Sequence, residues 1–241
     1  MPTKTPPVKS ATVAEGHFPG FRPAALAFFR DLTVSNEKAW FQANKPTYEL
    51  EVVKPMAMLV PELAAELARR KVPLTGDVKK SLFRIHRDVR FSNNKSPYKT
   101  HGGAVWSRDG VKMSPGVLYF HFDPEGSFVA AGFYVPEPPL LAKLRDAQVR
   151  RTDEFLEAVA ALAGRGLTLS REDALKRTPR GFEQYADGPL AEHLKLKSLI
   201  VSRPLSVKDV RGPALVAKLA DFAADALPLL TFGWAALDTP A

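Results

Sequence analysis

The sequence predicts an α+β fold in which a central, mainly antiparallel sheet is covered by N-terminal and C-terminal helices. Helical patterns dominate the first part of the chain, strand patterns fill the middle, and helical patterns return after Pro136. This order differs from the strand–helix alternation of a parallel α/β sheet. The composition, 45% hydrophobic and 25% charged over 241 residues, is typical of a globular protein. We predict one domain over residues 18–241 and a mobile polar tail over residues 1–17.

Three helices are predicted in the N-terminal part. The first begins at Pro23, where apolar residues recur at helical spacing. Asn36 can cap the second, which has the sequence NEKAWFQAN. The third runs from Pro46 toward Arg70, and its internal prolines predict a kink or a break.

Strand patterns occupy the middle of the chain. SLFRIHRDVRF alternates apolar and polar residues for most of its length, and HGGAVW is a second, shorter candidate. LYFHF and FVAAGFYV flank DPEGS, whose proline suits the second position of a tight turn. These two strands are therefore predicted to form a hairpin, and LKLKSLIVSRPL adds a further strand.

Helical patterns follow the strands. They are PPLLAKLRDAQVRR, DEFLEAVAALAG and PALVAKLADFAADAL. Gly164 is a stop signal for the second of these helices, and the third is predicted from Pro213 to Leu227.

Basic side chains concentrate in the stretch RIHRDVRFSNNKSPYKTH, Arg84–His101. From Lys79 to His101 the chain holds seven Lys or Arg and one acid, Asp88, which gives +6 of the formal net charge of +8. Such a local excess, interleaved with Asn, Ser, Tyr and His, can focus electrostatic potential and coordinate an anion. The alternative interpretation is a solvated sheet face on which Asp88 pairs with its arginine neighbours.

The candidate ligand-binding residues come from three neighbouring patterns. In an extended strand alternate residues share a face, so the polar side chains of Leu82–Phe91 line one side. The Asn and Ser residues that follow favour a turn, which brings the next donors to the end of the strand. A second basic cluster, LKRTPRGF, either closes over the first or is an exposed turn. The predicted ligand-binding residues are Arg84, His86, Asp88, Arg90, Lys95, Tyr98, Lys99, His101, Arg177 and Arg180.

Arg87 falls on the apolar side of the same predicted strand, together with Phe91. A buried guanidinium without a partner is strongly destabilising. We therefore expect Arg87 to pair with a carboxylate of the helical layer, Glu49 or Glu51, and to act as a structural clamp. A bulge that rotates the strand at this point is the alternative.

The basic stretch also resembles a known family. Its residues match the RxxRDxRF, Lys, Tyr signature of bacterial and fungal proteins grouped as domain of unknown function 2461. The resemblance extends from about Phe18 to the last helix and includes WFQANKPTYE and LKRTPRGF. It implies an intracellular single-domain protein and no catalytic roles, because the family has no assigned activity. The matching residues are Arg84, Arg87, Asp88, Arg90, Phe91, Lys95 and Tyr98.

Metal and nucleotide sites are not predicted. His86 with Asp88, and His121 with Asp123, have a spacing that some metal ligands share. However, arginines flank the first pair, and Asp123 is more simply a turn residue. The motifs GxSxG, GxxxxGK, GxGxxG and HExxH are absent, so no nucleophile class and no cofactor is identified. If the protein catalyses a reaction, His86 or His101 is the candidate general acid or base.

Three functions are compatible with the basic stretch. The first is a pocket that binds a small phosphate- or carboxylate-bearing ligand, with or without catalysis. The second is a nucleic-acid surface, and the third is a docking module for an acidic protein. Phe91 is expected to point inward, which leaves few aromatics for base stacking and favours the pocket. The chain lacks cysteine, a long apolar run and a secretory signal, so we expect a cytoplasmic protein without a membrane partner.

Overall fold

An antiparallel meander of four strands forms the centre of the fold. In the computed structural model, which describes residues 17–239, the strands pair in the order β1-β2-β3-β4, and every pairing is antiparallel. The predicted α+β class and the predicted hairpin, β2 with β3, are confirmed. The strands are β1 (Gly102–Trp106), β2 (Val117–Phe122), β3 (Ser127–Phe133) and β4 (Leu199–Leu205).

In the N-terminal part, residues 38–69 form one continuous helical run that contains a single irregular segment. Pro46 lies inside α2, so the prediction that a new helix begins there is wrong. The irregularity falls later, in a π-helical segment, η1. Pro55, two residues after η1, has no N–H and cannot donate to the carbonyl four residues earlier. The backbone N–H of Lys54 donates instead to Glu49, five residues back. The N-terminal helices are α1 (Pro23–Val34), α2 (Lys38–Tyr48), η1 (Glu49–Val53), α3 (Lys54–Arg69) and α4 (Val78–Ser81).

The C-terminal helix α9 is longer than predicted. The sequence pattern ends it at Leu227, but Pro228 lies within the helix, which continues to Asp238. Packing against α3, α6 and β3 stabilises α9, so the missing proline N–H does not end it. The remaining helices are α5 (Pro138–Arg150), α6 (Thr152–Ala163), η2 (Glu183–Tyr185), α7 (Ala191–Leu194), α8 (Val207–Val210) and α9 (Leu215–Asp238).

One face of the sheet packs against the helices and is apolar. Phe120 and Phe122 of β2 are fully buried on this face. Trp106 of β1 is buried beside them and donates its Nε1–H to a backbone carbonyl of α3 at 3.1 Å. Because successive side chains of a strand point to opposite faces, Tyr119 and His121 lie on the other side of the sheet.

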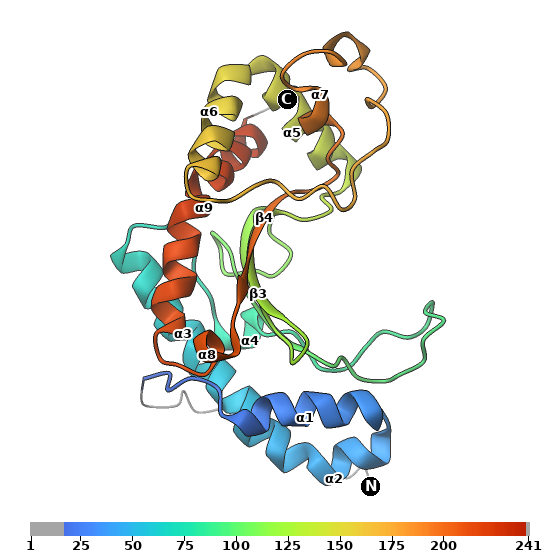
Figure 1. Cartoon of the computed structure of the whole chain (residues 1–241), viewed down its shortest axis with the longest axis vertical. Helices are drawn as coiled ribbons and strands as arrows, with labels where there is room; N and C mark the ends of the chain where they lie inside the picture. Colours follow the sequence, from blue (N-terminus) through green and yellow to red (C-terminus); the bar gives the residue numbers. More distant parts are fainter. Residues whose placement is uncertain (1–16, 240–241) are drawn as a thin grey trace, which may run out of the picture.

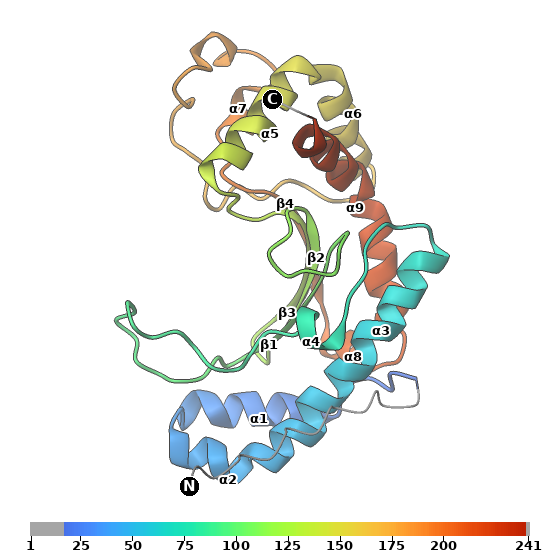
Figure 2. The same ribbon diagram turned by 180° about the vertical axis from the view of Figure 1, so that it is seen from behind.

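The other face of the sheet is turned toward the concave side of a crescent. Helices α1 and α2 form one end of the crescent, α5, α6 and α7 form the other, and α3 and α9 run along its back (Figures 1 and 2). The strand register places Tyr119 and His121 of β2 and Phe128 of β3 together on this side, which we call the open face. The segment between α4 and β1 projects from the same side (Figure 1).

Buried apolar side chains form one cluster that extends from Phe18 to Ala236. Phe18, where the sequence predicts that the folded part begins, is among them. Apart from His17, the predicted tail lies outside the described residues. No helix within residues 17–239 is long and apolar enough to cross a membrane.

Candidate functional site

The basic stretch forms an irregular two-stranded projection, residues 84–99, which we call the arm. Its two halves meet at an isolated bridge between His86 and Tyr98 and at a 2.7 Å hydrogen bond from the Lys99 N–H to the Ile85 carbonyl. The chain therefore doubles back as predicted, but the predicted regular strand over Leu82–Phe91 is wrong. Local side-chain bonds in the Asn- and Ser-rich tip replace strand pairing there.

Charges at the tip of the arm are largely satisfied by their own neighbours. Arg90 binds Asp88, with 2.6 Å between Nη2 and Oδ2, and this contact lowers the pKa of the Asp88 carboxyl. Lys95 donates from Nζ to the carbonyl of Val89 at 3.1 Å. Phe91, which the alternation pattern places inward, is 95% exposed. The predicted pairing of Asp88 with an arginine neighbour is therefore present at the tip, but the tip is not the sheet face that this alternative assumed.

Tyr98 anchors the arm to the N-terminal helices. Its ring stacks on Phe41 of α2 at 4.2 Å between centroids and is buried. The side-chain amide of Asn36 bonds to both the N–H and the carbonyl of Tyr98, each at 3.0 Å. His86 packs against the edge of the same two rings. Tyr98 and His86 thus hold the arm in place and do not point into a shared site with Arg90 or Lys95.

The predicted partners of Arg87 are engaged elsewhere. Glu51 forms a bidentate pair with Arg22, and Glu49 lies 3.6 Å from Lys45. Within residues 17–239, Arg87 has no ion pair, and its side chain is half-exposed. The prediction of a buried clamp is wrong because residues 86–99 leave the sheet, so the guanidinium reaches solvent.

Three cations converge where the arm joins the open face. Lys99 and Lys112 each hold Nζ 5.3 Å from the centre of the Phe83 ring. Burial first, and the charge of Arg84 second, lower the pKa of both lysines. Arg84 directly follows Phe83 in the chain. We call Arg84, Lys99 and Lys112 the cation cluster.

Within residues 17–239, no carboxylate neutralises the cation cluster. None of its three side chains forms an ion pair with a carboxylate of the described chain. The hydrogen bonds from Arg90, and to a smaller extent the charge of Arg84, lower the pKa of Asp88, but the Asp88 carboxylate is bound by Arg90 and not by Arg84. Lys112 also donates to the carbonyl of Leu82. Positive charges held together in this way, with donor capacity left over, suit an anionic ligand.

A row of half-buried polar side chains continues from the cluster across the open face. The Tyr119 hydroxyl lies 2.9 Å from Nδ1 of His121, and Nε2 of His121 lies 3.5 Å from Oδ2 of Asp123. His101, which precedes β1, packs its ring 4.4 Å from that of His121. The register explains the contact, because Gly103 of β1 pairs with His121, which puts His101 on the same face.

Burial controls the ionisation of this row. It lowers the pKa of His101 to about 4, with a smaller contribution from His121, and it also lowers the pKa of His121. It raises the pKa of Tyr119 to about 12. At neutral pH both imidazoles are therefore neutral and the phenol keeps its proton.

The structure thus redistributes the predicted site residues. Arg84 and Lys99, at the base of the arm, and His101 lie on or next to the open face, whereas His86, Asp88, Arg90, Lys95 and Tyr98 lie further out on the arm. Sequence reasoning did not select Lys112 or Tyr119 for the site, and it set His121 aside. The alternation in LYFHF, with Tyr119 and His121 on one face, was the signal that pointed to the row.

The second basic cluster does not join the first. Arg177 and Arg180 are exposed, and they lie in the loop between α6 and α7. Figures 1 and 2 show this loop at the opposite end of the crescent from the arm. The interpretation of LKRTPRGF as an exposed turn therefore fits the structure, and closure over the arm does not.

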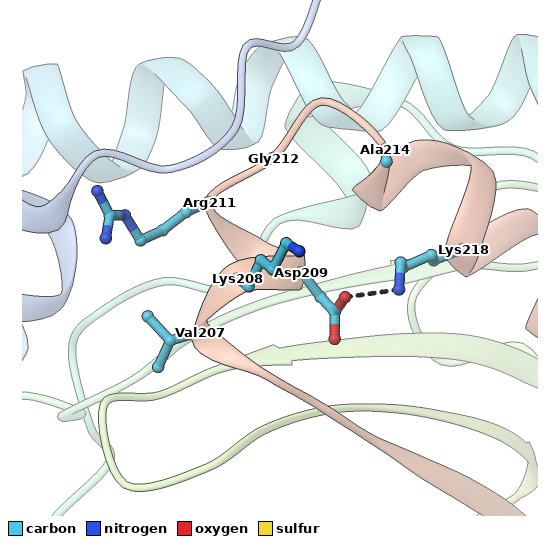
Figure 3. Close-up of a pocket in the computed structure, with 7 residues that line it drawn as sticks. All are labelled: Val207, Lys208, Asp209, Arg211, Gly212, Ala214 and Lys218. Carbon is cyan, nitrogen blue, oxygen red and sulfur yellow. Dashed lines mark ion pairs between the residues drawn. The ribbon is translucent and has the colours of Figure 1, made fainter.

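Two surface cavities lie away from all of these residues. The larger, about 840 Å³, is lined by the start of α9 and by α8, where Asp209 pairs with Lys218 at 2.6 Å (Figure 3). The smaller, about 560 Å³, lies between Arg211, the start of α1 and α3. None of the predicted ligand-binding residues lines either cavity, so neither cavity coincides with the predicted anion pocket.

Comparison with known proteins identifies one family. A family model described as "Conserved hypothetical protein (DUF2461)" matches residues 24–232. No curated protein and no solved structure matches the chain. The resemblance to this family is confirmed, and the description of the family assigns no activity.

Proposed function

We propose that this chain, which belongs to the DUF2461 family, binds a small phosphate- or carboxylate-bearing anion at the cation cluster. The observation that carries the proposal is the contact of Lys99 and Lys112 with the ring of Phe83, next to Arg84 in the chain, without an ion pair to any of the three within residues 17–239. The proposed site lies at the base of the arm and coincides with neither of the two cavities described above.

The physical argument is electrostatic. Like charges brought together and partly removed from water raise the free energy of the folded protein. Contact of both ammonium groups with the face of Phe83 offsets part of this cost, at about 0.5–1 kcal/mol each. An anion offsets the rest, because guanidinium and ammonium groups form their strongest hydrogen bonds with phosphate and carboxylate oxygens. Partial burial of Lys99 and Lys112 makes their bonds to an anion stronger than at a fully solvated surface.

One observation favours the alternative, a nucleic-acid surface. Phe91 is 95% exposed at the tip of the arm, and the guanidinium of Arg90 lies 5.8 Å from the centre of its ring. An exposed aromatic beside basic residues is the arrangement on which single-stranded bases stack. The expectation that Phe91 points inward, which favoured a pocket, no longer separates the two functions.

Calorimetric titration of inorganic phosphate and of citrate into the protein, at low ionic strength, tests the first proposal. We expect saturable binding that Arg84→Ala and Lys112→Met each weaken by about tenfold or more, since a hydrogen bond to a charged group is worth about 1.5–3 kcal/mol. Lys38→Met, on the exposed side of α2, is the matched control and should bind as the wild type does. Absence of binding, or equal losses in the control, would overturn the proposal.

The alternative is tested on the same proteins with a labelled single-stranded oligonucleotide. A nucleic-acid function requires that Phe91→Ala and Arg90→Ala lose anisotropy-detected binding, with an affinity that falls steeply with salt. Binding of phosphate that depends on Arg84 but not on Arg90 supports the small-anion function. Oligonucleotide binding that depends on Phe91, without phosphate binding, would replace it.

A further inference from the structure

Three metal-ligating side chains meet on the open face beside the cation cluster. One ligand atom from each of His101, His121 and Asp123 lies within 4.8 Å of the other two. They come from separate parts of the hairpin meander, since His101 precedes β1, His121 lies in β2 and Asp123 follows β2. Two imidazoles and one carboxylate are donors that suit Zn²⁺ and related first-row cations.

Neighbouring groups fix the orientation of two of these side chains. The Tyr119 hydroxyl holds Nδ1 of His121, which leaves Nε2 directed toward Asp123. Asp123 Oδ1 accepts a 2.7 Å hydrogen bond from the N–H of Glu125, while its Oδ2 faces His121. Metal-bound histidines and carboxylates are typically held by outer contacts of this kind, which set the tautomer and the ring orientation.

The distance between the donor atoms of His121 and Asp123 suits two ligands of one ion better than a direct hydrogen bond. His121 Nε2 and Asp123 Oδ2 are 3.5 Å apart, which is long for a hydrogen bond. Two ligands that bind one tetrahedral Zn²⁺ at their usual bond lengths lie about 3.3 Å apart. His101 makes no side-chain hydrogen bond within the described chain, so its ring is available as the third donor.

We propose that His101, His121 and Asp123 bind one first-row divalent cation, with Zn²⁺ as the representative ion. Three protein ligands leave at least one coordination position open, as in catalytic and not in structural zinc sites. Mg²⁺ and Ca²⁺ prefer sets made only of oxygen atoms and do not suit these donors. The proposal does not depend on anion binding by the cation cluster.

Lys99, two residues before His101 in the chain, carries a charge that opposes a cation here. Lys99→Met should therefore raise the affinity for Zn²⁺ by about two- to fivefold, the size expected of one partly screened charge. The same substitution should weaken phosphate binding, so opposite signs in the two titrations distinguish the metal site from the cation cluster.

The direct test uses the full chain without a histidine tag. Calorimetry with Zn²⁺, and visible absorption with Co²⁺, should show one ion per chain, while Mg²⁺ gives no signal. His101→Asn and His121→Asn should each weaken Zn²⁺ binding by at least about 100-fold. Loss of a group that only supports a ligand already costs about 10- to 100-fold, so loss of the ligand itself should cost at least as much. His86→Asn, a histidine of the arm, is the matched control and should leave the affinity unchanged.

The Asp123→Asn variant distinguishes loss of metal binding from loss of folding. The amide oxygen of Asn can still accept the Glu125 N–H that shapes the turn, so the hairpin keeps its geometry while the carboxylate charge is lost. We expect this variant to melt near the wild-type temperature in metal-free buffer and to bind Zn²⁺ at least about tenfold more weakly. Failure of the wild type to bind Zn²⁺ and Co²⁺, or equal binding by all variants, would overturn the proposal.

Discussion

The two faces of the sheet differ in what their side chains do for the protein. On the helix-covered face, Phe120, Phe122 and Trp106 are fully buried, and Trp106 satisfies its one polar group on α3. On the open face, Tyr119 and His121 are only half-buried, and the Lys99 and Lys112 charges beside them have no counter-charge within residues 17–239. Burial on the first face raises the free energy of unfolding, whereas the partly buried polar and charged groups on the second face lower it.

This difference is the basis on which we propose a site on the open face, where a count of charges alone would favour the arm. Proteins retain destabilising groups where a ligand or a reaction requires them. The tip of the arm is as basic as the cation cluster, yet Asp88 and a backbone carbonyl satisfy Arg90 and Lys95. Charge without a carboxylate partner, and not charge itself, is therefore the feature that supports the proposed anion site on the open face.

The largest predicted effect compares one phenylalanine from each face. Phe120→Ala should lower the free energy of unfolding by about 3–5 kcal/mol, because it leaves a cavity between the sheet and the helices. Phe128→Ala removes a half-buried ring stacked 4.6 Å from His121 and should cost only about 1 kcal/mol. Urea denaturation of both variants measures this. Equal losses would show that the open face also carries part of the core.

Local patterns account for the elements that sequence reasoning found. LYFHF, DPEGS and FVAAGFYV predict the hairpin, because alternation and turn chemistry are both local signals. The arm alternates in the same way but has no sheet partner, so Phe91 ends in solvent. Pro46 and Pro228 lie inside helices because tertiary packing overrides a local stop signal.

The site was less predictable than the fold because its residues meet through tertiary contacts. Lys112 lies in a loop between β1 and β2, and no local pattern directs it toward Phe83 and Arg84. His101 meets His121 only because of the register in which β1 pairs with β2. Sequence alone fixes neither contact, so it selected the continuous basic stretch instead.

We expect acidic pH to have an effect of intermediate size on the free energy of unfolding. The pKa of His101 falls from 6.5 to about 4 on folding, so between these pH values the unfolded chain binds more protons than the folded protein. Stability from this source is fully present above pH 6.5 and is lost as the pH falls toward 4. Because solvent screens a half-buried side chain, we expect the loss to be about 1 kcal/mol.

The His101→Asn variant isolates this contribution from the protonation of carboxylates. Urea midpoints measured across the same pH range should fall less steeply in the variant than in the wild type. His86→Asn, in which an arm histidine is removed, should follow the wild-type curve. Parallel curves for all three proteins would contradict burial of a neutral imidazole on the open face.

The smallest expected effect has the opposite sign to that of most substitutions. Burial and the charges of Arg84 and Lys112 lower the pKa of Lys99, so its charged form is less favourable in the folded protein than in the unfolded chain. Lys99→Met keeps the aliphatic contact with Phe83 and removes the charge, and it should raise the free energy of unfolding by about 0.3 kcal/mol at low salt. The gain should shrink in 1 M salt, where the screening length is about 3 Å. Lys38→Met, on the exposed side of α2, should show no gain at either salt concentration. A loss of stability in Lys99→Met would mean that the ammonium is already satisfied, and the contrast between the two faces of the sheet would then fail at the cation cluster.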